Sequence, residues 1–337
     1  MFGMYRFLLA TFVILGHLWN RVLPSTGGYA VFGFYVLSGY LMTLILNERY
    51  GFTIGGAIRY LGNRVLRIYP AYLCLVGITL IPLIVVPWLA CQLGRSLILP
   101  RTFMEWAANI GLLGLDHSLQ SRVIPQAWSL YVELAFYLFM VFLARNRTVT
   151  LAWFLSSIVL TGYLNIYGTG LDSIYYSIAS GSLPFSMGAM VYHFPVKARP
   201  GFLVPLVGLY IVNVLLLEPP YGGIDFYLAI ILSGLILIVL KDIKTPKWFA
   251  RIDKLAGDLS YPMYISHFTV GVYVLWAFWS NTPKHRGADF FFLSFGYTLI
   301  LSYAVHRYIE RPIEAIREKI KRVKIQRAIG SAVPAGD

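Results

Sequence analysis

The stretch FLLATFVILGHLW, residues 7–19, is apolar apart from Thr11 and one ionisable side chain, His17. Arg6 comes directly before it, eleven positions from His17, which on an α-helix is about three turns and a rise of roughly 16 Å. Both side chains would therefore lie on one helix face. Ionisable groups deep in a membrane helix are costly and commonly mark a functional path. The alternative is a snorkelling arginine and a hydrogen-bonded core histidine.

The rest of the chain is similarly apolar. Of 337 residues, 58% are hydrophobic and only 13% are charged, and the mean hydropathy is +0.67, whereas soluble domains average about 25% charged residues. We therefore expect an all-α, polytopic membrane protein. The two cysteines and the spacing of the histidines indicate neither a disulfide framework nor a metal site.

Ten apolar segments are close to the length that a membrane-spanning helix needs. They are residues 4–22, 29–47, 70–88, 127–144, 149–167, 174–194, 201–218, 225–240, 259–280 and 290–308. A shorter apolar segment, 103–115, is expected to be re-entrant or interfacial.

The distribution of basic residues predicts the orientation of these spans. With both termini in the cytoplasm, 22 of the 28 Lys and Arg residues fall on the inner side, as the positive-inside rule requires. The net charge of +13 therefore indicates inner loops rather than binding to nucleic acid. We expect a membrane domain over residues 1–312 and a basic cytoplasmic tail over 313–337. Its segment REKIKRVKIQR (317–327) is typical of an amphipathic helix on anionic membrane lipid.

A carboxylate lies inside the fourth predicted span. Glu133, in QAWSLYVELAFYLF (126–139), is predicted at a depth similar to that of His17. A buried carboxylate facing a buried imidazole could orient it and raise its basicity, as in a His–carboxylate catalytic pair. The alternative is an interhelical hydrogen bond that only fixes packing.

Two arginines mark the start of the third predicted span, RYLGNRVLRIYPAY (59–72). Arg64 and Arg67 are three positions apart and face one way on a helix. Two guanidinium groups on one face suit a phosphate-bearing ligand. The alternative is ordinary positive-inside charge.

Two further segments have adequate structural explanations. In STGGYAVFGFYVLSGYLM (25–42), Gly27 and Gly28 predict a turn, and Gly39 permits a close helix approach. In DLSYPMYISHFTV (258–270), His267 follows a helix-breaking proline, and a packed, hydrogen-bonded histidine is the simpler interpretation.

In this order and spacing, the signatures resemble the acyltransferase-3 family of integral membrane O-acyltransferases, over about residues 4–312. The matching signatures are Arg6-x10-His17, GGY leading into VFGFYVLSGYLM, RVLRIYPAY, AWSLYVELAFYL, GDLSYPMYISHF and the closing HRYIERP (306–312). Many members have two acidic residues where this chain has Glu133 followed by Leu134, so the resemblance leaves the role of Glu133 open.

The resemblance implies transfer of an acyl group, most simply acetyl from acetyl-CoA, to a hydroxyl of a glycan or lipid-linked glycan in a bacterial cytoplasmic (inner) membrane. It makes His17 the essential membrane histidine, and Glu133 its catalytic partner by our hypothesis. Arg6, Arg64 and Arg67 would bind the acyl donor, and no metal is expected.

Three alternatives stay open at this point. A transporter or flippase of a lipid-linked glycan would also place Arg, His and Glu inside spans, although the sequence has no evident internal repeat. A succinyltransferase of the same family is another, with Arg21 as a cation close to His17. The third is an inactive family member acting as a membrane sensor, against which the retained motif residues argue.

Overall fold

The computed structural model describes residues 1–19, 26–94, 96–116, 118–170, 172–216, 223–279 and 287–330, with side chains up to residue 320. Throughout these ranges every regular element is a helix, which confirms the all-α prediction. Arg21 lies outside the described residues.

The longer helices follow the apolar segments of the sequence. They are α1 (Phe2–Leu18), α2 (Thr26–Ile45), α3 (Ile54–Val85), α4 (Pro87–Leu93), α5 (Phe103–Gly111), α6 (Trp128–Leu143), α7 (Arg147–Tyr167), α8 (Ser182–His193), α9 (Leu203–Leu216), α10 (Ile224–Leu240), α11 (Lys247–Phe278), α12 (Ala288–Val305) and α13 (Arg311–Gly330). Short 3-10 or π turns join or extend them: η1 (Leu46–Tyr50), η2 (Pro125–Ala127), η3 (Asp172–Tyr176), η4 (Ala179–Gly181), η5 (Pro200–Phe202) and η6 (His306–Glu310).

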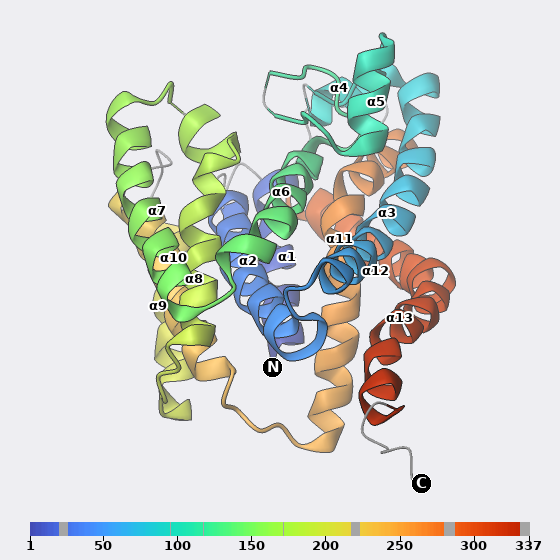
Figure 1. Ribbon diagram of the computed structural model, residues 1–337. Coiled ribbons are helices and arrows are strands. Elements are labelled where there is room, and N and C mark those ends of the chain that lie inside the picture. Colours follow the sequence, from blue (N-terminus) through green and yellow to red (C-terminus); the bar gives the residue numbers. More distant parts are fainter. Residues whose placement is uncertain are drawn as a thin grey trace, which may run out of the picture.

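Helices α1 and α2 occupy the centre of the bundle (Figure 1). α1 packs mainly against α11 and α2, and α2 packs mainly against α8. At the α2–α8 contact, a Cβ on Gly39 would lie only 2.2 Å from the carbonyl oxygen of Phe185. The predicted close approach at Gly39 is therefore confirmed. Most residues of α2 and about half of those of α1 are buried.

The predicted turn at Gly27 and Gly28 is wrong, because both residues belong to the first turns of α2. They are buried, and a Cβ on Gly16 of α1 would lie 2.8 Å from the backbone nitrogen of Gly27. The hydroxyl of Thr26 donates to the carbonyl of Phe12 at 2.9 Å and fixes this contact. The glycines thus serve helix–helix approach rather than chain reversal.

Among the described residues, five helical stretches are long and apolar enough to cross a membrane. They are Thr26–Tyr50, Ile54–Val85, Pro125–Leu143, Arg147–Tyr167 and Ala288–Ile320. Shorter apolar helices cover Phe2–Leu18, Pro200–Leu215 and Ile224–Leu240. Each of the ten predicted segments overlaps a helix, but the number of crossings stays a prediction. The segment at 103–115 contains the nine-residue α5, too short to span a bilayer.

The N-terminus and the C-terminal helix α13 lie at the same end of the bundle (Figure 1). In Figure 1 the N-terminus and α13 lie at one end of the bundle, and α4 and α5 lie at the other. The tail is helical over Arg311–Gly330, and the guanidinium of Arg317 donates to Asn63 Oδ1 of α3 at 3.3 Å. The division at residue 312 and the lipid contact of this tail stay predictions.

Candidate functional site

The three arginines singled out in the sequence line one cavity. Arg6 of α1 and Arg64 and Arg67 of α3 surround it together with Glu133 of α6. Its volume is about 750 Å³ including the part open to solvent, and we call it the arginine cavity. It is lined by Arg6, Val31, Phe34, Tyr35, Ser38, Met42, Arg64, Arg67, Ile68, Ser129, Leu130, Glu133, Tyr137, Ser260, Tyr261 and Tyr264.

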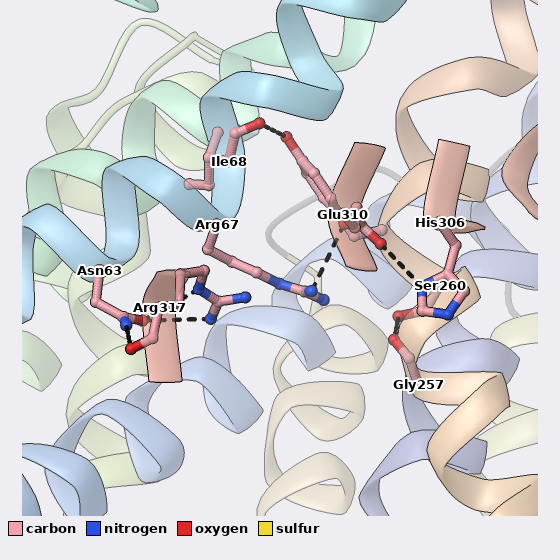
Figure 2. Close-up of polar contacts among 9 residues, drawn as sticks. Asn63, Arg67, Ile68, Gly257, Ser260, His306, Glu310 and Arg317 are labelled. Carbon is pink, nitrogen blue, oxygen red and sulfur yellow. Dashed lines mark hydrogen bonds and ion pairs between the residues drawn. The ribbon is translucent and has the colours of Figure 1, made fainter. Parts of the chain in front are cut away.

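Arg67 is held by Glu310, a residue of the segment HRYIERP (306–312). Its guanidinium forms an ion pair with Glu310 of η6 at 3.5 Å, and the other oxygen of Glu310 lies 3.5 Å from His306 Nδ1 (Figure 2). The guanidinium also lies 5.9 Å from the ring centre of Tyr261. Glu310 belongs to the segment HRYIERP, which contributes to the family resemblance, but the sequence did not indicate a role for this residue. The sequence signal that could have indicated this role is a single acidic residue between Arg307 and Arg311.

Arg64 is positioned differently, by neutral groups. Its guanidinium donates to Asn63 Oδ1 at 3.2 Å and lies 5.9 Å from the ring centres of Tyr60 and Tyr137. Its Nε has no hydrogen-bond partner among the described residues. Asn63 Oδ1 also accepts from Arg317 (Figure 2). The guanidinium of Arg317 therefore lies close to that of Arg64.

The charge around the arginine cavity favours an anionic ligand. Glu310 is engaged by Arg67. The carboxylate of Glu133 accepts hydrogen bonds from Ser38 at 2.9 Å and Tyr137 at 2.7 Å. Arg6 is close enough to Glu133 and to Arg64 and Arg67 to interact electrostatically with all three. Planar guanidinium groups that converge in this way match phosphate oxygens.

His17 is paired with His267. His17 Nδ1 lies 3.1 Å from His267 Nε2, and the rings stack with centroids 5.1 Å apart. His267 Nδ1 lies 2.7 Å from the carbonyl oxygen of Tyr264. Since a carbonyl only accepts, His267 Nδ1 carries a proton, its Nε2 accepts, and His17 Nδ1 donates. The basic lone pair of His17 is therefore on Nε2.

The hypothesis that Glu133 orients His17 is corrected by these contacts. The hydrogen bonds of Glu133 go to Ser38 and Tyr137, and Nδ1 of His17 is hydrogen-bonded to His267. Similar depth in two helices does not fix the rotation of either helix. His267 is fully buried and hydrogen-bonded, as predicted from the sequence, and its contact with His17 is the feature that the sequence did not indicate.

A second cavity contains His17, and we call it the histidine cavity. It has a volume of about 720 Å³, including open space. Val31 and Tyr264 line both cavities, so the two adjoin at these side chains. The histidine cavity is lined by Gly16, His17, Gly27, Gly28, Val31, Gly94, Ser96, Arg122, Pro125, Gln126, Trp128, Tyr175, Tyr176, Tyr264 and Phe268.

Comparison with protein families identifies the class of this protein. The sequence model of the acyltransferase-3 family, which is described as Acyltransferase domain, matches residues 4–307. Together with the long apolar helices, this match defines a membrane-embedded acyltransferase. The chain belongs to the acyltransferase-3 family and is an enzyme. Neither the curated proteins nor the solved structures include a match.

Proposed function

We propose that this enzyme transfers an acyl group, acetyl in the simplest case, from acyl-CoA to a hydroxyl of a cell-surface glycan or glycolipid. We place the enzyme in a bacterial cytoplasmic membrane, which the chain would cross ten times with both termini in the cytoplasm. One observation carries the proposal: a cavity with converging arginines adjoins a cavity with a hydrogen-bonded histidine, and both are lined by Val31 and Tyr264.

The arginine cavity is proposed to bind the donor. Arg6, Arg64 and Arg67 would bind the phosphates of CoA at the cytoplasmic side, where this donor is made. The pantetheine arm would then extend along α1, past Val31 and Tyr264, and bring the thioester to His17. Glu133, bonded to Ser38 and Tyr137, would line this path as a polar group rather than serve as the partner of His17.

The histidine cavity is proposed to hold the reacting groups. His17 Nε2 removes the proton from the acceptor hydroxyl as its oxygen attacks the thioester carbonyl carbon. The carbon–sulfur bond breaks, the ester forms, and the CoA sulfur leaves with the proton that His17 had taken. A covalent acyl-histidine that then transfers to the acceptor is the alternative route.

The remaining alternatives differ in their support. Membership of the acyltransferase-3 family favours an enzyme over a transporter or an inactive sensor. A succinyltransferase stays compatible with the same fold and donor cavity, because the two thioesters share the CoA part.

The test of the proposed function is acyl transfer by membranes that contain the protein. Membranes are incubated with acetyl-CoA labelled in the acetyl group, and label in ester linkage to envelope glycan is measured against membranes without the protein. We expect protein-dependent, base-labile label. If acetyl-CoA gives none, succinyl-CoA is tried under the same conditions. Failure with both donors would contradict the proposal.

Removing the partner of His17 is expected to slow transfer without weakening donor binding. In His267→Phe, His17 Nδ1 loses its acceptor and the Nε2-basic tautomer is no longer fixed, so we expect kcat to fall roughly 10-fold or more. In His267→Gln, the amide oxygen lies near the place of Nε2 and should restore much of the rate. Steady-state kinetics should give an unchanged KM for acyl-CoA. Equal losses in both variants would indicate a packing role only.

A further inference from the structure

The histidine cavity contains a buried cation that the proposed reaction does not use. Arg122, in the loop between α5 and α6, lines this cavity with His17, and only 8% of its surface is exposed. Its backbone nitrogen donates to the carbonyl of Ser96 at 2.8 Å, which holds the residue against the α4–α5 connection. A guanidinium stays charged at any physiological pH, so a full positive charge lies in the cavity.

No described residue neutralises this charge by direct contact. Nε of Arg122 has no hydrogen-bond partner among the described residues, and the ion pairs found there do not include it. Burial lowers the pKa of the Arg122 guanidinium, while Tyr176 and the carboxylate of Asp116 act in the opposite direction. Asp116 accepts from Ser118 instead. A buried charge without a partner is costly unless a ligand supplies one.

Aromatic rings next to Arg122 fit a sugar. Trp128, Tyr175 and Tyr176 line the same cavity, and each pair of their rings has centroids 4.8 Å apart. The Oε1 of Gln126, also buried in this wall, accepts no hydrogen bond among the described side chains and backbone groups. The cavity thus combines flat apolar faces, an amide oxygen for hydroxyl donors and one cation.

We propose that Arg122 makes the histidine cavity an anion-binding subsite, which receives a carboxylate or phosphate of the substrate while the reactive hydroxyl or thioester lies at His17. This inference rests on the proposed function and adds a charge requirement to it. The anion has two possible sources. It is an acidic group on the acceptor sugar, or it is the distal carboxylate of a dicarboxylic acyl chain such as succinyl.

The test measures binding, so that it does not depend on transfer. Purified protein in lipid nanodiscs is titrated with two sets of probes. The acceptor set is glucuronate and glucose 6-phosphate against glucose; the donor set is succinyl-CoA against acetyl-CoA. Wild type is compared with Arg122→Gln, which removes the charge but keeps a polar side chain, and with Arg101→Ala as a control. Arg101 is an exposed arginine that precedes α5 and does not line the cavity among the residues described.

In one of the two sets, we expect wild type and Arg101→Ala to bind the probe with the additional anionic group roughly 10- to 100-fold more tightly than the probe that lacks this group. Arg122→Gln should lose this preference and keep its affinity for acetyl-CoA. Loss in the acceptor set assigns the anion to the sugar, and loss in the donor set assigns it to the acyl chain. Absence of any preference in wild type, or its persistence in Arg122→Gln, overturns the inference. The membrane transfer assay separately decides the proposed function.

Discussion

Replacing His17 with asparagine is expected to reduce acyl transfer by roughly 10²- to 10⁴-fold, the usual contribution of a positioned general base. The asparagine amide nitrogen lies near the position of Nδ1, so it can still donate to His267 Nε2, which accepts from His17 Nδ1 at 3.1 Å in wild type. The basic Nε2 is lost and most of the packing is kept. The loss would therefore report on chemistry rather than folding.

The measurement is the initial rate of label transfer from acetyl-CoA, or from succinyl-CoA if that is the active donor, at matched protein levels in the membrane. Donor binding by the variant, measured in nanodiscs, should stay within a few-fold of wild type, because Arg6 and the other cavity arginines are unchanged. Transfer by His17→Asn at the wild-type rate would remove His17 from the mechanism. Label that stays covalently on wild-type protein when no acceptor is present, and not on the variant, would favour the acyl-histidine route over direct general-base attack.

Part of the arginine cavity was predictable, because two of its arginines give a local signal. Arg64 and Arg67 are three positions apart on one helix, and any helix places them on a common face. Their convergence with Arg6 of α1 came from the resemblance rather than from spacing, and the structure brings all three to one cavity. The helical fold was predictable for a related reason: the apolar segments are long, and backbone groups in a bilayer must be satisfied within the segment.

The partner of His17 was not predictable from spacing, because it depends on the rotation of helices that are distant in the chain. His17 and His267 are 250 positions apart, and the depth of a residue in a predicted span does not show which distant helix it faces. Depth alone favoured Glu133, which faces Ser38 and Tyr137 instead. The burial of Arg122 was not predictable either, because an arginine in a predicted outer loop is expected to be solvated. Only the folded loop shows that it is buried beside the histidine cavity.

The second large effect is expected at Arg64, where alanine should raise the KM for acyl-CoA roughly 10- to 100-fold, the range for losing one or two charge-assisted hydrogen bonds to phosphate. Arg64 is a cleaner target than Arg67. Removing Arg67 would take the guanidinium partner from the buried carboxylate of Glu310 and would destabilise the fold as well. Among the residues that the structure describes, Arg64 donates to the neutral Asn63 and packs on two tyrosine rings. Its removal therefore breaks none of the ion pairs found there.

The origin of the effect can be separated with two donors that carry the same thioester. Acetyl-CoA has the phosphates, and S-acetylpantetheine lacks them. Wild type should prefer acetyl-CoA strongly, whereas Arg64→Ala should lose much of this preference and use S-acetylpantetheine almost as well as wild type does. Arg59→Ala is the matched control, because Arg59 lies on the same helix, α3, and is not among the described residues that line the arginine cavity. An Arg64→Ala enzyme that kept the full preference for acetyl-CoA would show that the phosphates bind elsewhere. The arginine cavity would then have to admit a different anion.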